Sequence, residues 1–268
     1  MQKIVVGLLC GLLMGTVARA DEVAVSSSTN VVTPVAVGIP APQKDWKAEV
    51  GFDYFSEYVF RGVDVSRHQP LIEPHMLAGW KDFTATFVGY YSDYKAPGNS
   101  WYTEHDYSLD YTHAFGKFGL TAGGLYYSYP RGQSGIDTWD LYGVATYDYP
   151  LLNPKMTINW DVDKLGGGYG TLGISHNFDL TKTVGLKDPM TLTITPSAAL
   201  GIDFGYNSQQ TRADVNWNDV LLGLSAGWQV TKNVQLHTGV QYSIALDSLH
   251  EINQQNEVIG NVGVTLTF

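Results

Sequence analysis

Asn261-Val262-Gly263-Val264-Thr265-Leu266-Thr267-Phe268 ends the chain, and its side chains alternate between two kinds. Every even-numbered position is apolar, and every odd-numbered position is asparagine, glycine or threonine. Successive side chains of a β-strand point to opposite faces, so this period of two predicts a strand with one apolar and one polar face. An amphipathic helix would repeat its apolar residues every three or four positions, which this stretch does not do.

The same alternation recurs from Trp46 onward. In the runs 47–54 and 190–203, apolar side chains occupy alternate positions and polar or small side chains lie between them. Pro196 falls inside the second run and predicts a local bulge or a shifted boundary, since proline breaks a ladder hydrogen bond. We predict twelve strands, at residues 47–59, 70–80, 83–94, 103–115, 118–128, 138–149, 155–163, 169–178, 190–204, 217–230, 233–245 and 257–268.

The predicted connections alternate in length along the chain. Short ones lie at 81–82, 116–117 and 231–232, and longer ones at 61–69, 95–102, 130–137, 205–216 and 247–256. Long loops at one end of an antiparallel meander and short turns at the other are typical of outer-membrane barrels. We therefore predict an all-β protein, a transmembrane antiparallel up-and-down β-barrel of about 12 strands in the cell outer membrane.

Composition agrees with this class and excludes two others. Charged residues make up 16% of the 268 positions, aromatic residues 13%, and the mean hydropathy is -0.09. A helical membrane protein would need spans of about 20 apolar residues. A disordered chain would be poor in aromatic residues. A soluble β-sandwich is the remaining alternative, but Tyr and Trp at predicted strand ends and few charges on the apolar face favour lipid.

The first 45 residues are predicted to precede the barrel. Residues 1–20 have the features of a secretory signal peptide, with Lys3, an apolar stretch at 4–14 and the cleavage site Ala18-Arg19-Ala20. Residues 21–45 form a flexible lead segment rich in Val, Pro and Ser, and residues 46–268 form the barrel. Cleavage would leave 14 basic and 26 acidic residues, a net charge of -12, which argues against nucleic-acid binding.

Two stretches resemble known outer-membrane proteins. The last eight residues are similar to the terminal strand that such proteins present to the barrel-assembly machinery, which implies that Val264, Leu266 and Phe268 form the recognised face. Ser56-Glu57-Tyr58-Val59-Phe60-Arg61-Gly62-Val63, followed by Ser66, resembles the S-x-Y-x-F-R-G-x-S stretch of TorF-type porins. That family consists of exported barrels regarded as channels. This chain differs from it in carrying Asp64-Val65 before the serine.

Twelve strands give a barrel of roughly 12 Å backbone radius, wide enough for ions and small solutes if the loops leave it open. The alternation places these mostly acidic residues on the inner face: Glu49, Asp53, Glu57, Arg61, Glu73, Asp106, Asp110, Asp140, Asp148, Asp161, Asp163 and Asp203. The few bases facing them are Lys47, Arg61, His75 and His237. We predict a channel for passive diffusion with mild cation preference. The alternative is that these acids and bases hydrogen-bond to one another inside a plugged or narrow barrel. Arg61 is expected to pair with Glu57 or Asp53, with contact to solute as the alternative.

Two other function classes remain open. One is a non-conducting structural or adhesive barrel, and the other is a phospholipase-like enzyme. Ser175-His176-Asn177 has catalytic residue types, but consecutive strand residues face opposite sides. The same geometry argues against metal sites at Glu104-His105-Asp106 and His250-Glu251. We predict no enzyme activity, no cofactor, and outer-membrane lipid and the barrel-assembly machinery as partners, with no indication of oligomeric state.

Overall fold

A computed structural model describes residues 46–96, 100–130, 137–149, 151–207 and 215–268. The predicted signal peptide and lead segment lie outside these residues. The elements are β1 (Trp46–Phe55), β2 (Val59–Phe60), β3 (Val63–Asp64), β4 (Leu71–Trp80), β5 (Phe83–Ala96), β6 (Ser100–Phe115), β7 (Phe118–Ser128), β8 (Thr138–Tyr147), β9 (Lys155–Asp161), β10 (Gly168–Ser175), β11 (Phe178–Asp179), β12 (Thr191–Phe204), β13 (Asn216–Gln229), β14 (Val234–Ala245), α1 (Asp247–Glu251) and β15 (Glu257–Thr267). None of the described residues belongs to a helix long and apolar enough to span a membrane.

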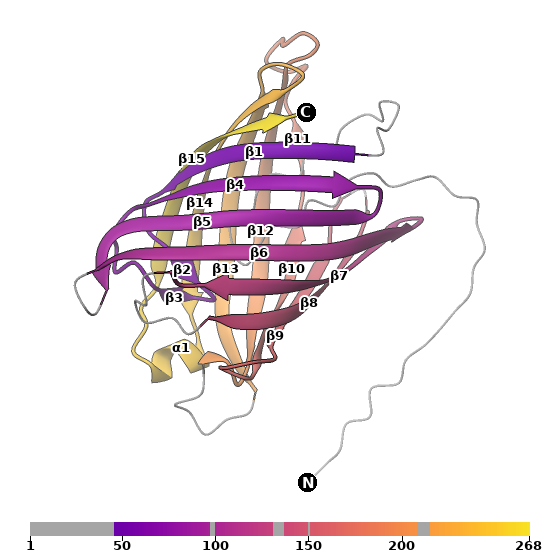
Figure 1. The fold of residues 1–268 in the computed structure, drawn as a ribbon. Coiled ribbons are helices and arrows are strands. Elements are labelled where there is room, and N and C mark those ends of the chain that lie inside the picture. Colours follow the sequence, from indigo (N-terminus) through magenta and orange to yellow (C-terminus); the bar gives the residue numbers. More distant parts are fainter. Residues whose placement is uncertain (1–45, 97–99, 131–136, 150, 208–214) are drawn as a thin grey trace.

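The wall is one closed sheet (Figure 1). β1 pairs with β4 on one side and with β15 on the other, and β10 pairs with β12, so the strand order closes on itself. All of these pairings are antiparallel. β10 and β11 are parts of one strand, because Ser175 opposite Ser197 and Phe178 opposite Ile194 share one register. The result is a closed antiparallel barrel of twelve strands, which confirms the predicted fold class and excludes the sandwich.

Proline residues mark interruptions in the ladder. Pro196 of β12 faces the gap between β10 and β11, where its carbonyl oxygen accepts a 3.2 Å hydrogen bond from His176 N. Proline has no N–H to donate, so the ladder stops there without a change of register. Pro74 of β4 marks a similar interruption of the ladder with β5. The bulge in this part of the wall lies between Gly201 and Ile202 and not at Pro196.

The two faces of the wall reverse the pattern of a water-soluble barrel. Along β1, Val50, Phe52 and Tyr54 point outward and are 43–47% exposed, whereas Asp53 and Phe55 point inward and are 3% exposed. An apolar surface of this extent is unfavourable in water and suits the hydrocarbon of a membrane. Exposed aromatic side chains lie at both ends of the strands: Trp46, Trp80, Phe83, Phe115, Phe118, Trp228 and Phe268 at one end, and Tyr54, Trp101, Trp139, Trp160, Trp217 and Tyr242 at the other. Such rings are typical of the two membrane interfaces.

Connections differ at the two ends of the barrel. The end that we call the turn end has tight turns at 81–82 and 116–117, and both the start of β1 and the end of β15 lie there. The other end, the loop end, has the long connection 56–70 and the connection that contains α1. Figure 1 shows α1 and the β2–β3 hairpin at this end, opposite the C-terminus. The predicted alternation holds for these connections but not for 180–190, which lies at the turn end and is longer than 162–167 at the loop end.

If the outer face of the wall meets lipid, the free-energy cost of placing a lysine there should depend on its depth in the membrane. On any other exposed sheet this cost would not depend on position in the same way. Val262 lies in the middle of β15 and Val258 near its loop end, and both are outward-facing, at 55% and 60% exposure. We expect Val262→Lys to lower the free energy of unfolding by about 2–4 kcal/mol and Val258→Lys by about 0–1 kcal/mol. Urea titration of the barrel folded in lipid vesicles measures both values. Equal costs at the two depths would contradict the membrane placement.

Candidate functional site

The first long connection, residues 56–70, folds into the barrel. β2 and β3 form a hairpin whose turn is Arg61-Gly62, with φ angles of 49° and 81°. Positive φ at both central positions is the signature of a type I′ turn, which suits a two-residue hairpin loop. We call β2, β3 and this turn the inner hairpin. The predicted first strand, 47–59, is therefore too long, because the chain leaves the wall at Phe55.

Arg61, at the tip of the inner hairpin, reaches the opposite wall. Its guanidinium pairs with the Asp140 carboxylate of β8 and donates a 3.0 Å hydrogen bond to the Tyr127 hydroxyl of β7. The side chains of Arg61 and Asp140 are 2% and 0% exposed, so the ion pair is shielded from water. The expectation that Arg61 pairs with Glu57 or Asp53 is wrong, because the turn directs the side chain away from its own strand.

Further contacts fix the position of the turn. The carbonyl oxygen of Arg61 accepts a 2.9 Å hydrogen bond from Asn218 Nδ2 of β13. The guanidinium carbon of Arg61 lies 4.1 Å from the centroid of the Tyr206 ring, a cation–π contact. A Cβ atom on Gly62 would lie 2.5 Å from Leu249 Cδ1 of α1, so glycine is required both by its φ and by this close approach. The tip of the hairpin is thus held by residues from several strands and from α1.

An apolar cluster packs the inner hairpin against the wall. Tyr58 stacks on Tyr90 with 4.8 Å between ring centroids, and the two residues are 3% and 0% exposed. Around them lie Phe55, Val59, Leu71, Val88, Tyr102 and Ile259. Each fully buried large apolar side chain contributes roughly 1.5–3 kcal/mol to stability. The hairpin is therefore part of the packed interior at the loop end.

A histidine and three carboxylates meet where the hairpin reaches the loop end; we call Glu57, Asp64, His68 and Glu257 the mouth cluster. His68 Nδ1 lies 2.8 Å from Glu57 Oε2, and 3.4 Å from both Asp64 Oδ2 and Glu257 Oε2. The hydrogen bond with Glu57 and the charges of Asp64 and Glu257 raise the pKa of His68 above 6.5. The cluster therefore favours the imidazolium form and ties both ends of the hairpin to β15.

The structure separates the predicted inner-face residues into three groups. Asp53, Glu57, Arg61, Glu73, Asp106, Asp110, Asp140, Asp161 and Asp203 are buried inside the barrel. Glu49 is on the inner face with a side chain that is 35% exposed. Asp148 and Asp163 are exposed beyond the ends of β8 and β9, because both strands end earlier than predicted.

Several of the buried carboxylates hold loops in place. Asp161 Oδ1 accepts hydrogen bonds from the backbone N–H groups of residues 163, 165 and 166, at 2.9–3.1 Å. Asp203 Oδ1 accepts bonds from Tyr206 N and Asn207 N at 2.8 and 2.9 Å. A buried carboxylate with several N–H donors is well satisfied. These two residues therefore have a structural role besides their negative charge.

Sequence reasoning missed several buried polar residues. Glu104, Asp219 and Glu257 are 1%, 0% and 4% exposed and belong to the interior. Glu104 and Asp106 lie two positions apart on β6, so their side chains face the same side of the wall. The alternation of side chains therefore places Glu104 inside, as it does Asp106. The Tyr127 contact to Arg61 joins positions 66 residues apart, and no local pattern reveals it.

The side chains of the motifs considered for catalysis and metal binding do not converge on one point. The His176 ring packs against Phe178 at 4.4 Å, whereas Asn177 Oδ1 accepts a hydrogen bond from Thr195. His105 bonds to Tyr91, while its neighbour Glu104 bonds to Tyr102. Alternation of side chains along a strand keeps such neighbours on opposite faces. Leu266 and Phe268 of the predicted assembly signal are exposed on the outer face, and Val264 is partly buried.

Comparison with known proteins identifies the architecture. No family model and no curated protein matches the chain, so the TorF-type resemblance stays a prediction. Among solved structures, the KdgM porin is similar with a TM-score of 0.55 and 13% identity, over 82% of this chain and 99% of that chain. The NanC porin is similar with a TM-score of 0.50 and 11% identity, over 82% and 98%. At this identity the likeness shows the fold.

Removing Arg61 should release the inner hairpin. In Arg61→Ala the buried Asp140 carboxylate loses its partner, and breaking a buried pair in this way costs about 3–5 kcal/mol. We expect faster amide hydrogen exchange across residues 56–70 and a lower free energy of unfolding. Lys232→Ala, at an exposed position between β13 and β14, serves as the control for loss of a basic side chain and should change neither. Equal behaviour of the two variants would argue against the ion pair as the main anchor.

The mouth cluster predicts a pH dependence of the connection 56–70. Because the pKa of His68 is raised on folding, its contribution is fully present below pH 6.5 and is lost as pH rises through the raised pKa. We expect NMR titration to find the His68 pKa above 6.5, and Glu57→Gln to lower it. Glu251→Gln, on α1, should leave it unchanged. A His68 pKa that does not respond to Glu57→Gln would disprove this assignment.

Proposed function

We propose that this chain is a porin-like channel of the Gram-negative outer membrane, for passive diffusion of ions or small solutes. The observation that carries the proposal is the arrangement of the wall, with apolar side chains outside and polar side chains within a closed barrel. Twelve strands enclose a backbone cylinder of roughly 12 Å radius. Membrane lipid would contact the outer face, and Val264, Leu266 and Phe268 would serve the barrel-assembly machinery.

The charge of the interior supports a preference for cations. Among the described residues, eleven aspartate and glutamate residues are buried, whereas Arg61 is the one buried arginine or lysine. A negatively charged lining attracts cations and repels anions. Most of these acids lie toward the loop end, where the strands carry Asp53, Glu73, Asp140, Asp203 and Asp219. We therefore propose that ion selection takes place in the loop-end half of the barrel.

The position of the inner hairpin is evidence for a narrow path for ions through the barrel. It brings Arg61, Phe60 and Tyr58 into the interior, and Arg61 spans from the hairpin to β7 and β8. A loop folded into a barrel reduces the free cross-section that the strand number alone allows. We propose that the conductance is small and that the inner hairpin sets it.

A non-conducting structural or adhesive barrel is the second candidate. It is favoured by the same apolar cluster, because Tyr58, Tyr90 and their neighbours occupy space that a channel would leave to water. We further propose that the chain is not an enzyme, since the catalytic residue types at 175–177 face different sides.

Single-channel recording in planar bilayers tests the proposal. We expect small conductance steps, and a reversal potential in a KCl gradient of the sign for cation selectivity. Replacing the turn and β3 with a shorter linker should increase the conductance, whereas Lys232→Ala, at an exposed position between β13 and β14, should not. Asp106→Asn with Asp110→Asn should shift the reversal potential toward zero. A folded barrel that conducts neither with nor without the hairpin would establish the non-conducting candidate, and anion selectivity would contradict the acidic-lining argument.

A further inference from the structure

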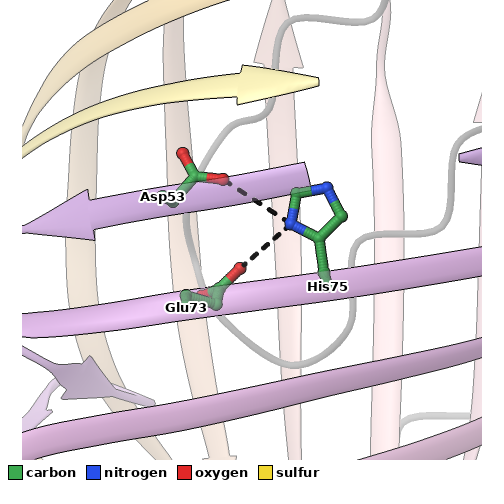
Figure 2. Close-up of side chains that lie close together, drawn as sticks. All are labelled: Asp53, Glu73 and His75. Carbon is green, nitrogen blue, oxygen red and sulfur yellow. Dashed lines mark ion pairs between the residues drawn. The ribbon is translucent and has the colours of Figure 1, made fainter. Parts of the chain in front are cut away.

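We propose that the inner wall binds one divalent transition-metal ion at Asp53 of β1 and at Glu73 and His75 of β4 (Figure 2). We call these three residues the wall cluster. Figure 2 shows the imidazole and the two carboxylates turned toward one another. The inference concerns binding and does not depend on whether the barrel conducts.

The three ligand atoms surround a space of suitable size. His75 Nδ1 lies 3.6 Å from Asp53 Oδ2 and 4.0 Å from Glu73 Oε1. These separations are too long for direct hydrogen bonds. Ligands that bind zinc tetrahedrally at about 2.0–2.1 Å lie about 3.3 Å apart. All three ligand atoms lie within 4.8 Å of one another, so a contraction of at most about 1.5 Å, within the freedom of a glutamate side chain, would complete the coordination.

One oxygen of Glu73 faces the wall cluster, and the other has no partner. Glu73 is 8% exposed, and its Oε2 atom has no hydrogen-bond partner among the described residues. A buried carboxylate atom without a donor is costly, and Asp53 beside it adds like-charge repulsion. A dication between the two carboxylates removes their repulsion, and a carboxylate that binds a metal ion through both oxygens would also give Oε2 a partner.

Surrounding residues orient the ligands as outer-shell groups do in metal sites. His237 Nε2 lies 2.6 Å from Asp53 Oδ1, which leaves Oδ2 directed at the wall cluster. Glu49 Oε1 lies 3.6 Å from His75 Nε2, on the side of the ring opposite Asp53 and Glu73. At this distance Glu49 does not hydrogen-bond to the ring, and it acts on His75 through its negative charge. Asp53 and His75 therefore each have a supporting group.

Two glycines create the space for the imidazoles. Gly51 is opposite His75 in the β1–β4 register, and a Cβ atom there would lie 2.1 Å from His75 Nε2. Gly263 is opposite both Asp53 and His237, and a Cβ atom there would lie 2.3 Å from His237 Nε2. Each histidine ring therefore occupies the space beside a glycine of the neighbouring strand. The wall is therefore shaped so that both rings converge on Asp53.

The ligand chemistry indicates the class of ion. One imidazole nitrogen and two carboxylate oxygens suit first-row dications, with zinc as the practical probe. Three protein ligands leave a coordination position for water. The side chain of Glu49, on the turn-end side of the cluster, is 35% exposed, which gives an ion a route from the lumen.

Calorimetric titration of the chelator-treated, detergent-folded barrel with Zn²⁺ tests the site. We expect one equivalent to bind, and Co²⁺ to give a visible d–d spectrum at the same stoichiometry. His75→Ala should weaken Zn²⁺ binding by at least about 100-fold, and Glu49→Gln, which removes one negative charge beside the cluster, should weaken it less. Gly51→Ala should weaken binding while keeping every ligand, because its methyl group displaces the His75 ring.

Matched variants separate this site from others. Gly260→Ala, where a Cβ atom would meet nothing closer than 3.9 Å, and His113→Ala should bind Zn²⁺ as the parent does. Heat-modifiable migration on a gel confirms that each variant is folded. Unchanged binding in folded His75→Ala, loss of binding only in His68→Ala of the mouth cluster, or no binding by the parent barrel would each overturn the proposal.

Discussion

The structure depends on one constraint, which is that no backbone N–H or C=O group may be left unpaired where the chain meets hydrocarbon. The pairing of β1 with β15, from Glu49 opposite Thr267 to Phe55 opposite Asn261, satisfies this at the seam. A shift of one residue there would exchange the two faces of β15. The register that closes the barrel at this seam is thus also the register that puts the polar side chains of β15 inside.

The inner hairpin follows from the polar interior that closure creates. A guanidinium in the lumen needs an acceptor, and Asp140 across the barrel supplies it while Tyr127 and Tyr206 complete its surroundings. A buried ion pair adds little net stability over apolar packing, but breaking it is costly. The Arg61–Asp140 pair therefore defines where the hairpin lies more than how stable the barrel is. Stability there comes from the aromatic cluster around Tyr58.

The alternation of side chains predicted the wall and could not predict contacts across the lumen. The number of strands, the inward or outward direction of their side chains and the lengths of the connections follow from local patterns. The inner position of Asp53 or Asp110 follows from the alternation of side chains along its strand. The partners of Arg61 lie 66 and 79 residues away, and only the barrel brings them together. Asp148 and Asp163 were placed inside because strand ends are poorly marked by periodicity. The wall cluster needed the registers of Gly51 and Gly263, which the sequence alone does not contain.

Charge balance connects the hairpin, the lumen and the wall cluster. Among the described residues, Arg61 is the one buried arginine or lysine and eleven acids are buried, several of which are satisfied by hydrogen bonds, as Asp161 and Asp203 are by backbone N–H groups. Within the described ranges, the hydrogen bonds of Asp53 come from side chains and Glu73 has no backbone donor, and the two acids lie on neighbouring strands at opposed positions. Burial of such a pair is tolerable only when a proton or a cation balances it. The proposed metal ion would balance this pair, because His75 adds a nitrogen ligand beside the two carboxylates.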